Sequence, residues 1–134
     1  MKLLNNLYCI NAIDQSEEGI LCSIRLIEEC PVYKAHFPMQ PITPGACVVQ
    51  MALEIYEEFK SLRVQEVQSS IVEGIEIVKV KNAKFLNAMI PGGGRVFRYA
   101  IKETAAEQGL IQLQVVVTSD DVTYAKLSLI CKEI

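Results

Sequence analysis

Hydrophobic and polar residues alternate with a period of two along several stretches of the chain. In Leu110–Thr118 a hydrophobic residue occupies every second position and polar residues occupy most of the positions between. This period is typical of a strand with one buried face. It predicts strands over Gly19–Ile27, Val96–Lys102, Leu110–Thr118 and Val122–Cys131, the last two joined by a turn at 119–121.

The stretch Ile71–Leu86 is also predicted to be a strand, although its alternation is interrupted. Ile75 and Ile77 share a face that Lys79 would continue. A β-bulge near Val78 would resolve this conflict, because a bulge inserts one extra residue into a strand. We expect the strands that follow the helix to pair as an antiparallel meander.

One segment, from Thr43 to about Arg63, has the pattern of a long helix instead. Thr43 belongs to a residue type that caps helices, Pro44 suits the first helical turn, and the segment contains no proline or glycine after Gly45. Its first half is apolar on nearly every side, whereas its second half carries charged residues. This pattern predicts a helix that is enclosed at its start and exposed toward its end.

These elements predict an α+β fold with one antiparallel sheet and one buried helix. A single sheet can bury its apolar face against one helix only by curling around it. Such a sheet leaves edge strands with unpaired backbone groups, which favours a dimer. The run Pro91-Gly92-Gly93-Gly94 is predicted to be a turn, because it lacks the helix and the Lys-Ser/Thr pair of a phosphate-binding loop.

The composition narrows the class of protein. A chain of 134 residues is expected to form one domain, residues 1–134. A hydrophobic content of 51% with 22% charged residues excludes a disordered chain, and no apolar run reaches the length of a membrane span. The formal net charge of −3 argues against nucleic acid as a partner, since phosphate binding needs a basic surface.

The five cysteines are expected to be free thiols of a cytoplasmic protein, because they form no C-x-x-C pair and no cluster of zinc-ligand spacing. Cys22 and Cys47 lie among apolar residues, where a reduced cysteine packs as a small hydrophobic side chain. An activated thiol at Cys47, near the start of the helix, is the alternative. Asn5 and Asn6 interrupt the N-terminal apolar run before it reaches the length of an export signal.

The most distinctive motif is the segment 35–45, which reads AHFPMQPITPG. It holds three of the five prolines, and each proline fixes φ and favours an extended conformation in the preceding residue. His36 is the only histidine, and the loop leads directly to the start of the helix, where backbone N–H groups are unpaired. A rigid loop that holds a side chain titrating near neutral pH predicts a functional histidine, with a packed structural histidine as the alternative.

The run His36-Phe37-Pro38-x-x-Pro41-x-x-Pro44-Gly45, followed by an apolar helix, resembles the signature of the 3-hydroxyacyl-acyl-carrier-protein dehydratases of type II fatty acid synthesis. The likeness continues in 81–86 and 90–92, which resemble the next strand of that family and its Pro-Gly turn. The resemblance implies the hotdog fold, in which a curved antiparallel sheet wraps one long central helix. It also implies a homodimer, able to assemble further, with active sites at the subunit interface.

The resemblance assigns roles to several residues. His36 would be the general base that removes the Cα proton of a (3R)-hydroxyacyl thioester, and the Gly45 backbone N–H would polarise the thioester carbonyl. Phe37 and Pro44 would contribute to substrate binding beside Gly45. The chemistry implies no cofactor and no metal. The acyl chain would be carried by acyl carrier protein or coenzyme A. Lysines 34, 79, 81 and 84 could form a basic rim for that carrier, with solvated lysines that protect a strand edge as the alternative.

Gln50 departs from the family pattern. The family places an aspartate or glutamate five residues after the motif glycine, and this residue reaches the site from the partner subunit to protonate the departing hydroxyl. An amide cannot supply that proton. Gln50 could still hold the hydroxyl or a water molecule by hydrogen bonding. Glu54, one turn later on the same helix face, is a candidate substitute that would contact the substrate. The alternative is that Gln50, Glu54, Glu57 and Ser61 form a stripe that faces away from the core.

Three functions follow from this pattern. The first is dehydration of hydroxyacyl thioesters, or the reverse hydration. The second is a non-catalytic subunit that binds acyl thioesters and has lost the acid. The third is thioester hydrolysis on the same fold, for which Glu54 is the candidate residue. None of them requires a membrane or a nucleic acid as partner.

Overall fold

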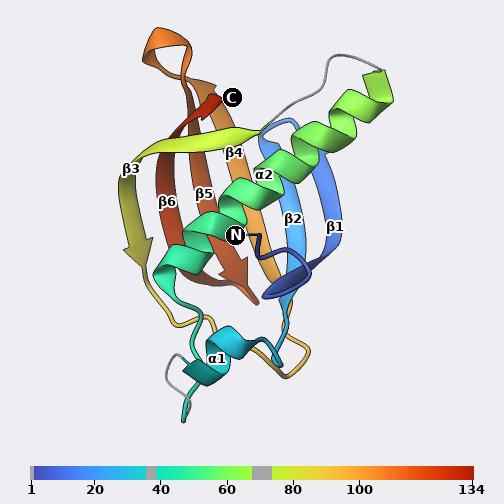
Figure 1. The fold of residues 1–134 in the computed structure, drawn as a ribbon, viewed down its shortest axis with the longest axis vertical. Helices are drawn as coiled ribbons and strands as arrows, with labels where there is room; N and C mark the ends of the chain where they lie inside the picture. The colour runs from blue at the N-terminus through green and yellow to red at the C-terminus, as the bar shows by residue number, and fades with distance from the viewer. Residues whose placement is uncertain (1, 36–38, 68–73) are drawn as a thin grey trace.

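A long helix lies in front of a curved sheet in the computed structural model, which describes residues 2–35, 39–67 and 74–134 (Figure 1). The strands are β1 (Tyr8–Ser16), β2 (Gly19–Leu26), β3 (Ile75–Phe85), β4 (Phe97–Ala105), β5 (Ile111–Ser119) and β6 (Val122–Glu133). The helices are α1 (Pro31–Ala35) and α2 (Gly45–Val67), with a short 3₁₀ turn at Glu107–Gly109. The expected α+β architecture of the hotdog fold, one helix wrapped by an antiparallel sheet, is confirmed.

The strand order is β1-β2-β4-β5-β6-β3, and all neighbouring strands are antiparallel. Strands β4, β5 and β6 form the predicted meander. The turn between β5 and β6 places Asp120 and Asp121 at φ values of 48° and 64°, a left-handed pair that matches the twist of a hairpin. The expectation that β3 joins this meander is wrong, because β3 pairs with β6 at the far edge of the sheet.

Two elements lack a clear sequence pattern. Strand β1 pairs with β2 at one edge, and a register shift between Ile10 and Ala12 interrupts its alternation at Asn11. Most of its later residues are exposed, so they carry little hydrophobic signal. Helix α1 has only five residues, which is too short for a helical period to be recognised.

Helix α2 begins two residues later than predicted and extends beyond Arg63 to Val67. Its fully buried section is Met51–Tyr56, in the middle of the helix, while Ala46 in the first turn is exposed. The prediction of an enclosed start is therefore wrong for the single chain, and the predicted exposure toward the end is confirmed by 61–63. Within the described ranges, no helix combines the length with the apolar character that crossing a bilayer requires.

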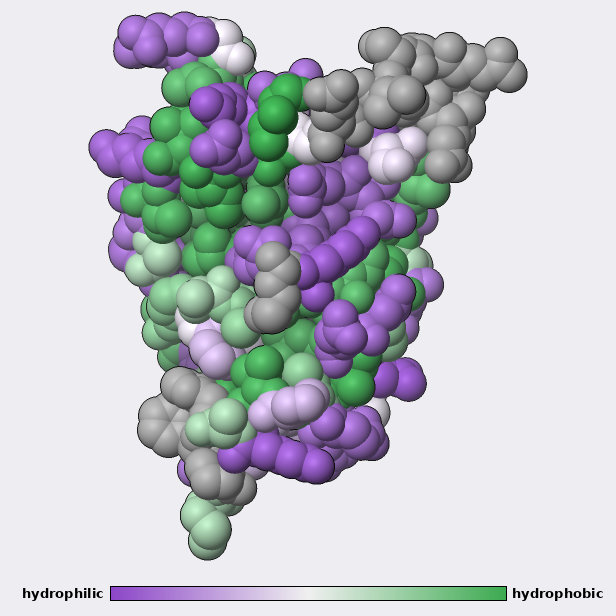
Figure 2. All heavy atoms as spheres, in the orientation of Figure 1, coloured by the Kyte–Doolittle hydropathy of each residue, from purple (hydrophilic) through white to green (hydrophobic). Residues whose placement is uncertain are grey.

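The core lies between α2 and the concave face of the sheet. Its largest fully buried side chains come from both layers and from the N-terminal segment: Leu7, Tyr8, Ile24, Val48, Met51, Ile55, Tyr56, Phe97, Tyr99, Ile101, Leu113 and Leu129. Hydrophilic residues run across the middle of the helix face, over α2, with hydrophobic residues on both sides (Figure 2). The helix thus buries one side in the sheet and presents its other side to the surface.

Strand β3 is an edge strand with exposed hydrophobic residues. The predicted bulge at Val78 is confirmed by a register shift between Ile77 and Lys79, and a second shift follows between Val80 and Asn82. The side chains of Val78 and Val80 are 50% and 46% exposed. An apolar edge with unpaired backbone groups is a surface that proteins usually cover.

Candidate active site

The start of α2 is fixed by a buried hydrogen-bond network around Thr43. The Thr43 backbone N–H and its hydroxyl both donate to the Met89 carbonyl oxygen, each at 2.9 Å. The hydroxyls of Tyr33 and Thr43 are 2.8 Å apart. Because the single hydroxyl proton of Thr43 is directed to Met89, Tyr33 is the donor in this second contact. Burial raises the pKa of Tyr33 to about 12, even though its hydrogen bond with Thr43 acts in the opposite direction.

This network shows that Thr43 does not cap the helix. The carbonyl of Pro44 accepts hydrogen bonds from the backbone N–H groups of Cys47, at 2.9 Å, and Val48, at 3.1 Å. Pro44 therefore occupies the N-cap position, and the helix proper starts at Gly45. The predicted role of Thr43 as a cap is wrong because its hydroxyl ties the loop to the 86–90 segment instead.

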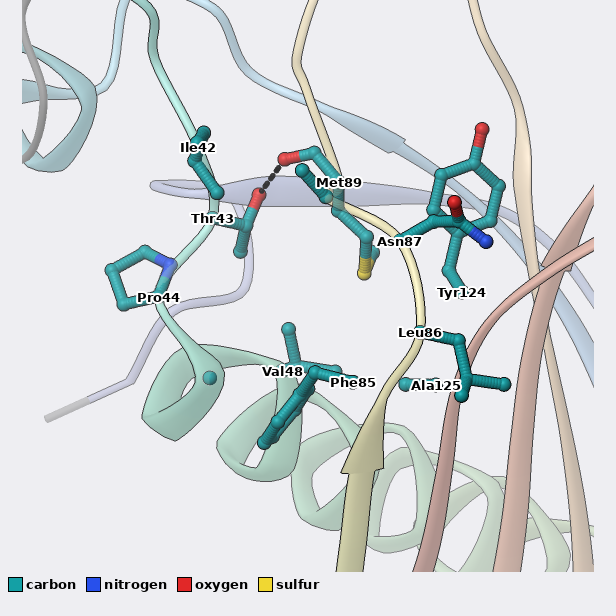
Figure 3. Close-up of a pocket in the computed structure, with 12 residues that line it drawn as sticks. Ile42, Thr43, Pro44, Val48, Phe85, Leu86, Asn87, Met89, Tyr124 and Ala125 are labelled. Carbon is teal, nitrogen blue, oxygen red and sulfur yellow. Dashed lines mark hydrogen bonds between the residues drawn. The ribbon is translucent and has the colours of Figure 1, made fainter.

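A cavity of about 360 Å³ opens beside this helix start. The segments 42–45 and 85–89 form its two sides, and Val48, Tyr124 and Ala125 complete the lining. The Thr43–Met89 hydrogen bond closes one end, while Val48 and Phe85 lie on the side of the helix (Figure 3). The lining is mostly apolar, with Thr43, Asn87 and Tyr124 as its polar residues and no charged side chain, and it suits an acyl chain better than a charged ligand.

The cavity brings together two of the predicted site residues, Pro44 and Gly45. His36 and Phe37 lie outside the described residues, so their predicted roles stay predictions. Gly45 faces the ring of Phe85, and a Cβ added to Gly45 would lie 2.9 Å from the Phe85 Cζ atom. A side chain at this position would push against the ring, so glycine at the first residue of the helix leaves the ring undisturbed at the wall of the cavity.

Gln50 and Glu54 are outside the lining of this cavity and contact each other. The Gln50 Nε2 atom donates to Glu54 Oε2 at 3.0 Å. Glu54 is buried, with 3% exposure, and its oxygens also accept hydrogen bonds from the N-terminal segment 3–8. The alternative of a stripe facing away from the core therefore does not hold for Glu54, and its occupied oxygens argue against its use as a substitute acid.

Cys47 has the properties of a packing residue. It is half-buried, and burial raises the pKa of its thiol, with smaller effects in the same direction from Cys30 and Glu54. A raised pKa disfavours the reactive thiolate at neutral pH. All five cysteines are free thiols, as expected, and no group of residues suited to hold a metal ion occurs in the described parts of the chain.

The sequence pattern missed the residues that support the site. Tyr33 and Tyr124 are single aromatic residues in segments with no motif, and only the fold brings them to the helix start. The contacts of Glu54 with backbone N–H groups leave no signal in the sequence at all. Phe85 had a signal, because it belongs to the 81–86 run that carries the family resemblance.

Comparison with known proteins decides the family. The family model of the ApeI dehydratase and its relatives matches residues 12–126. The chain belongs to the ApeI-like dehydratase family. Curated relatives of this family member include the 3-hydroxyacyl-[acyl-carrier-protein] dehydratase FabZ of Thermotoga maritima, which is 27% identical over 119 residues, 88% of this chain and 80% of the relative. An uncharacterised thioester dehydrase of Halalkalibacterium halodurans is 29% identical over 86 residues, 64% of this chain and 53% of the relative.

Solved structures support the fold of this ApeI-like protein. The dehydratase heterocomplex ApeI:P of Xenorhabdus doucetiae contains a chain that matches with a TM-score of 0.62 and 16% identity, covering 92% of this chain and 96% of the other. A protein of the thioesterase superfamily matches with a TM-score of 0.60 and 13% identity, covering 92% and 82% of the two chains. At these identities the structural matches establish the shared fold.

Proposed function

We propose that the protein dehydrates (3R)-hydroxyacyl thioesters, or hydrates the corresponding enoyl thioesters, in the cytoplasm. The observation that carries this proposal is the position of Gly45 at the start of α2 and on the wall of an apolar cavity, in a chain of a dehydratase family. The acyl chain would lie in the cavity, with its thioester attached to acyl carrier protein or coenzyme A. A FabZ relative is named for an acyl-carrier-protein substrate, which favours the carrier protein.

Proton removal and charge stabilisation would be divided between two groups. The His36 imidazole would take the proton from Cα, and electron density would move onto the thioester oxygen. The Gly45 N–H is at the N-terminus of α2, where it can donate to that oxygen without reorganisation. The C3–O bond then breaks, and the hydroxyl leaves as water after it gains a proton.

Gln50 lies outside the cavity of its own subunit, so across the proposed dimer interface it would hold the 3-hydroxyl of a chain bound in the partner subunit's cavity, but it would not protonate that hydroxyl. General acid catalysis typically contributes about 10²–10⁴ to a rate, so its loss predicts a slow enzyme rather than an inert one. Water is then the source of the last proton.

The edge strand β3 would form the centre of a homodimer. Its exposed Val78 and Val80, and the exposed Ala46 at the start of α2, are apolar residues that a second copy would cover. The exposed lysines 79, 81 and 84 on the same strand would flank the site and attract an acidic carrier protein.

Hydration of a short enoyl thioester tests the activity. The conjugated absorbance should fall with time in the presence of the protein, and His36→Ala should reduce the rate about a hundredfold or more. An unchanged absorbance at high protein concentration, with His36→Ala indistinguishable from the natural sequence, would remove the proposed activity.

A non-catalytic partner subunit is the second candidate. Two observations favour it: Gln50 replaces the acid, and the matched chain of Xenorhabdus doucetiae belongs to a dehydratase heterocomplex. This candidate predicts thioester binding without turnover, and turnover only after mixing with a catalytic partner. Robust turnover by the purified protein alone would reject it.

A further inference from the structure

Glu54 uses its full hydrogen-bonding capacity on donors from its own chain. Its Oε2 atom accepts from the Leu3 N–H at 2.8 Å and from Gln50 Nε2 at 3.0 Å. Its Oε1 atom accepts from the Leu4 N–H at 2.8 Å and from the Tyr8 hydroxyl at 3.1 Å. A carboxylate has about four lone-pair positions, and these four donors fill them.

The N-terminal segment holds this carboxylate in place. Leu3 and Tyr8 are buried against the core, and Leu4 forms an isolated bridge with Tyr8. The two backbone N–H groups that reach Glu54 therefore belong to a packed turn. A carboxylate fixed by two such amides cannot rotate to follow Gln50, so Gln50 must adapt to it.

The contact decides which end of the Gln50 amide is free. An amide oxygen facing the carboxylate would be repelled, so the NH₂ group must point to Glu54. The amide oxygen lies on the other side of the same planar group and points away from Glu54. Gln50 is half-buried, which leaves its side chain partly open to a ligand. The amide oxygen of Gln50 is therefore a hydrogen-bond acceptor to which a group of the ligand can donate.

We infer that Glu54 is a positioning residue that orients the Gln50 amide, so that the site selects acyl chains with a 3-hydroxyl over chains without one. The inference rests on the proposed function and its dimer, because Gln50 lies outside the cavity of its own subunit and its oxygen is taken to face an acyl chain bound in the partner subunit's cavity. A 3-hydroxyl donates to this oxygen, whereas a 3-deoxyacyl chain leaves it unpaired. The penalty for an unpaired buried acceptor corresponds to about a tenfold to hundredfold difference in affinity.

Binding of two pantetheine amides tests this selectivity, since amides do not undergo the elimination. One probe carries (3R)-3-hydroxydecanoyl and the other decanoyl, and calorimetry gives both dissociation constants. The natural sequence should prefer the hydroxyl probe about tenfold to a hundredfold. Glu54→Gln should bring the ratio close to unity, because a glutamine can donate as well as accept and lets the Gln50 amide turn around. Tyr8→Phe is the matched control, which removes one donor to Glu54 without touching Gln50 and should keep the preference.

An NMR measurement distinguishes reorientation of the Gln50 amide from a general loss of stability. The ¹⁵N–¹H signals of the Gln50 side-chain NH₂ should shift in Glu54→Gln and remain in place in Tyr8→Phe. If Glu54→Gln does not fold, Gln50→Met provides the test, because it removes the amide oxygen at nearly constant volume. It should abolish the preference for the hydroxyl while binding of the decanoyl probe is retained.

The outcomes distinguish this inference from the proposed function. Equal affinity of the natural sequence for both probes, or a preference that survives in Glu54→Gln and Gln50→Met, overturns the inference and leaves the proposed function intact. Binding of neither probe overturns the proposed function and the inference together. A preference lost equally in Tyr8→Phe and Glu54→Gln means that Glu54 acts only through stability, which also overturns it.

Discussion

The ring of Phe85 lies against Gly45, at distances of 2.9 Å from Cζ and 3.0 Å from Cε2 to the position that a Cβ of residue 45 would take. Gly45 is not among the glycines with positive φ, so its backbone conformation is open to other residues. The requirement for glycine is therefore one of space. Phe85 is 50% exposed and can move, but it moves at the wall of the cavity.

Gly45→Ala is expected to lower activity far more than stability. The methyl group should displace the Phe85 ring across the cavity and reduce kcat/KM about a hundredfold, as small misplacements at a reacting centre do. The free energy of unfolding should change by less than about 1 kcal/mol, because alanine favours the helix and the half-exposed ring can yield. Steady-state kinetics and urea unfolding measure the two effects. In a Phe85→Leu background, Gly45→Ala should reduce kcat/KM much less, because the ring is absent. An equal reduction of kcat/KM with Phe85 and with Leu at position 85 would contradict this explanation.

Gln50→Glu is expected to create a proton donor. Its carboxyl group would replace an amide 3.0 Å from Glu54, and two carboxylates at this distance do not both ionise. The pair would share one proton, which is available to the departing hydroxyl, so the dehydration rate should rise by about 10²–10⁴. The gain should disappear as the pH rises and the shared proton is lost. A kcat profile against pH measures this, with Gln50→Met as the control that should show no gain. An unchanged rate in folded Gln50→Glu would mean that proton donation is not limiting.

Thr43→Val is expected to destabilise the helix start by about 1–3 kcal/mol. The substitution keeps the shape of the side chain but leaves the Tyr33 hydroxyl without its acceptor in a buried site. Tyr33→Phe should cost less, because it removes the donor itself. Urea unfolding of both single variants and the double variant gives the coupling. If the two costs simply add, the two hydroxyls do not act as one network.

The protein is expected to lose stability in alkaline solution through its buried thiols. Burial raises the pKa of Cys131 from 9.0 to about 11. Between these pH values the unfolded chain releases a proton that the folded chain retains, so the free energy of unfolding falls as pH rises. The contribution of the Cys131 thiol to the free energy of unfolding is complete below pH 9.0. It decreases by about 1.4 kcal/mol per pH unit above that value and is lost near pH 11. Urea unfolding of Cys131→Ala should show a shallower decrease, whereas Val117→Ala, equally buried and not ionisable, should keep the slope.

Val80→Lys is expected to separate the proposed dimer. The substitution would place a charge in the middle of the exposed apolar section of β3, where burial by a second copy would be costly. Sedimentation should then show a monomer with unchanged secondary structure. Leu21→Lys, at a comparably exposed residue of β2, is the control and should leave the dimer intact. A dimer that persists in Val80→Lys would mean that the chains associate through another surface.

The periodicity of the sequence predicted those elements whose side chains alternate regularly between core and solvent. Strands β2, β4, β5 and β6 and most of α2 belong to this group, and the bulge at Val78 followed from a break in the same pattern. The position of β3 beside β6 could not be predicted, because strand order depends on packing between distant segments. The burial of Glu54 was missed for the same reason, since its partners are backbone groups about fifty residues away.

The strand order has a consequence for biosynthesis. Strand β3 is made directly after α2, but its neighbour within the subunit, β6, is the last strand to leave the ribosome. Until then both long sides of β3 lack a partner, whereas in the complete subunit one side is paired with β6. Nascent chains that stop short of residue 122 therefore carry a fully unpaired strand, which makes them more prone to aggregate than the complete subunit.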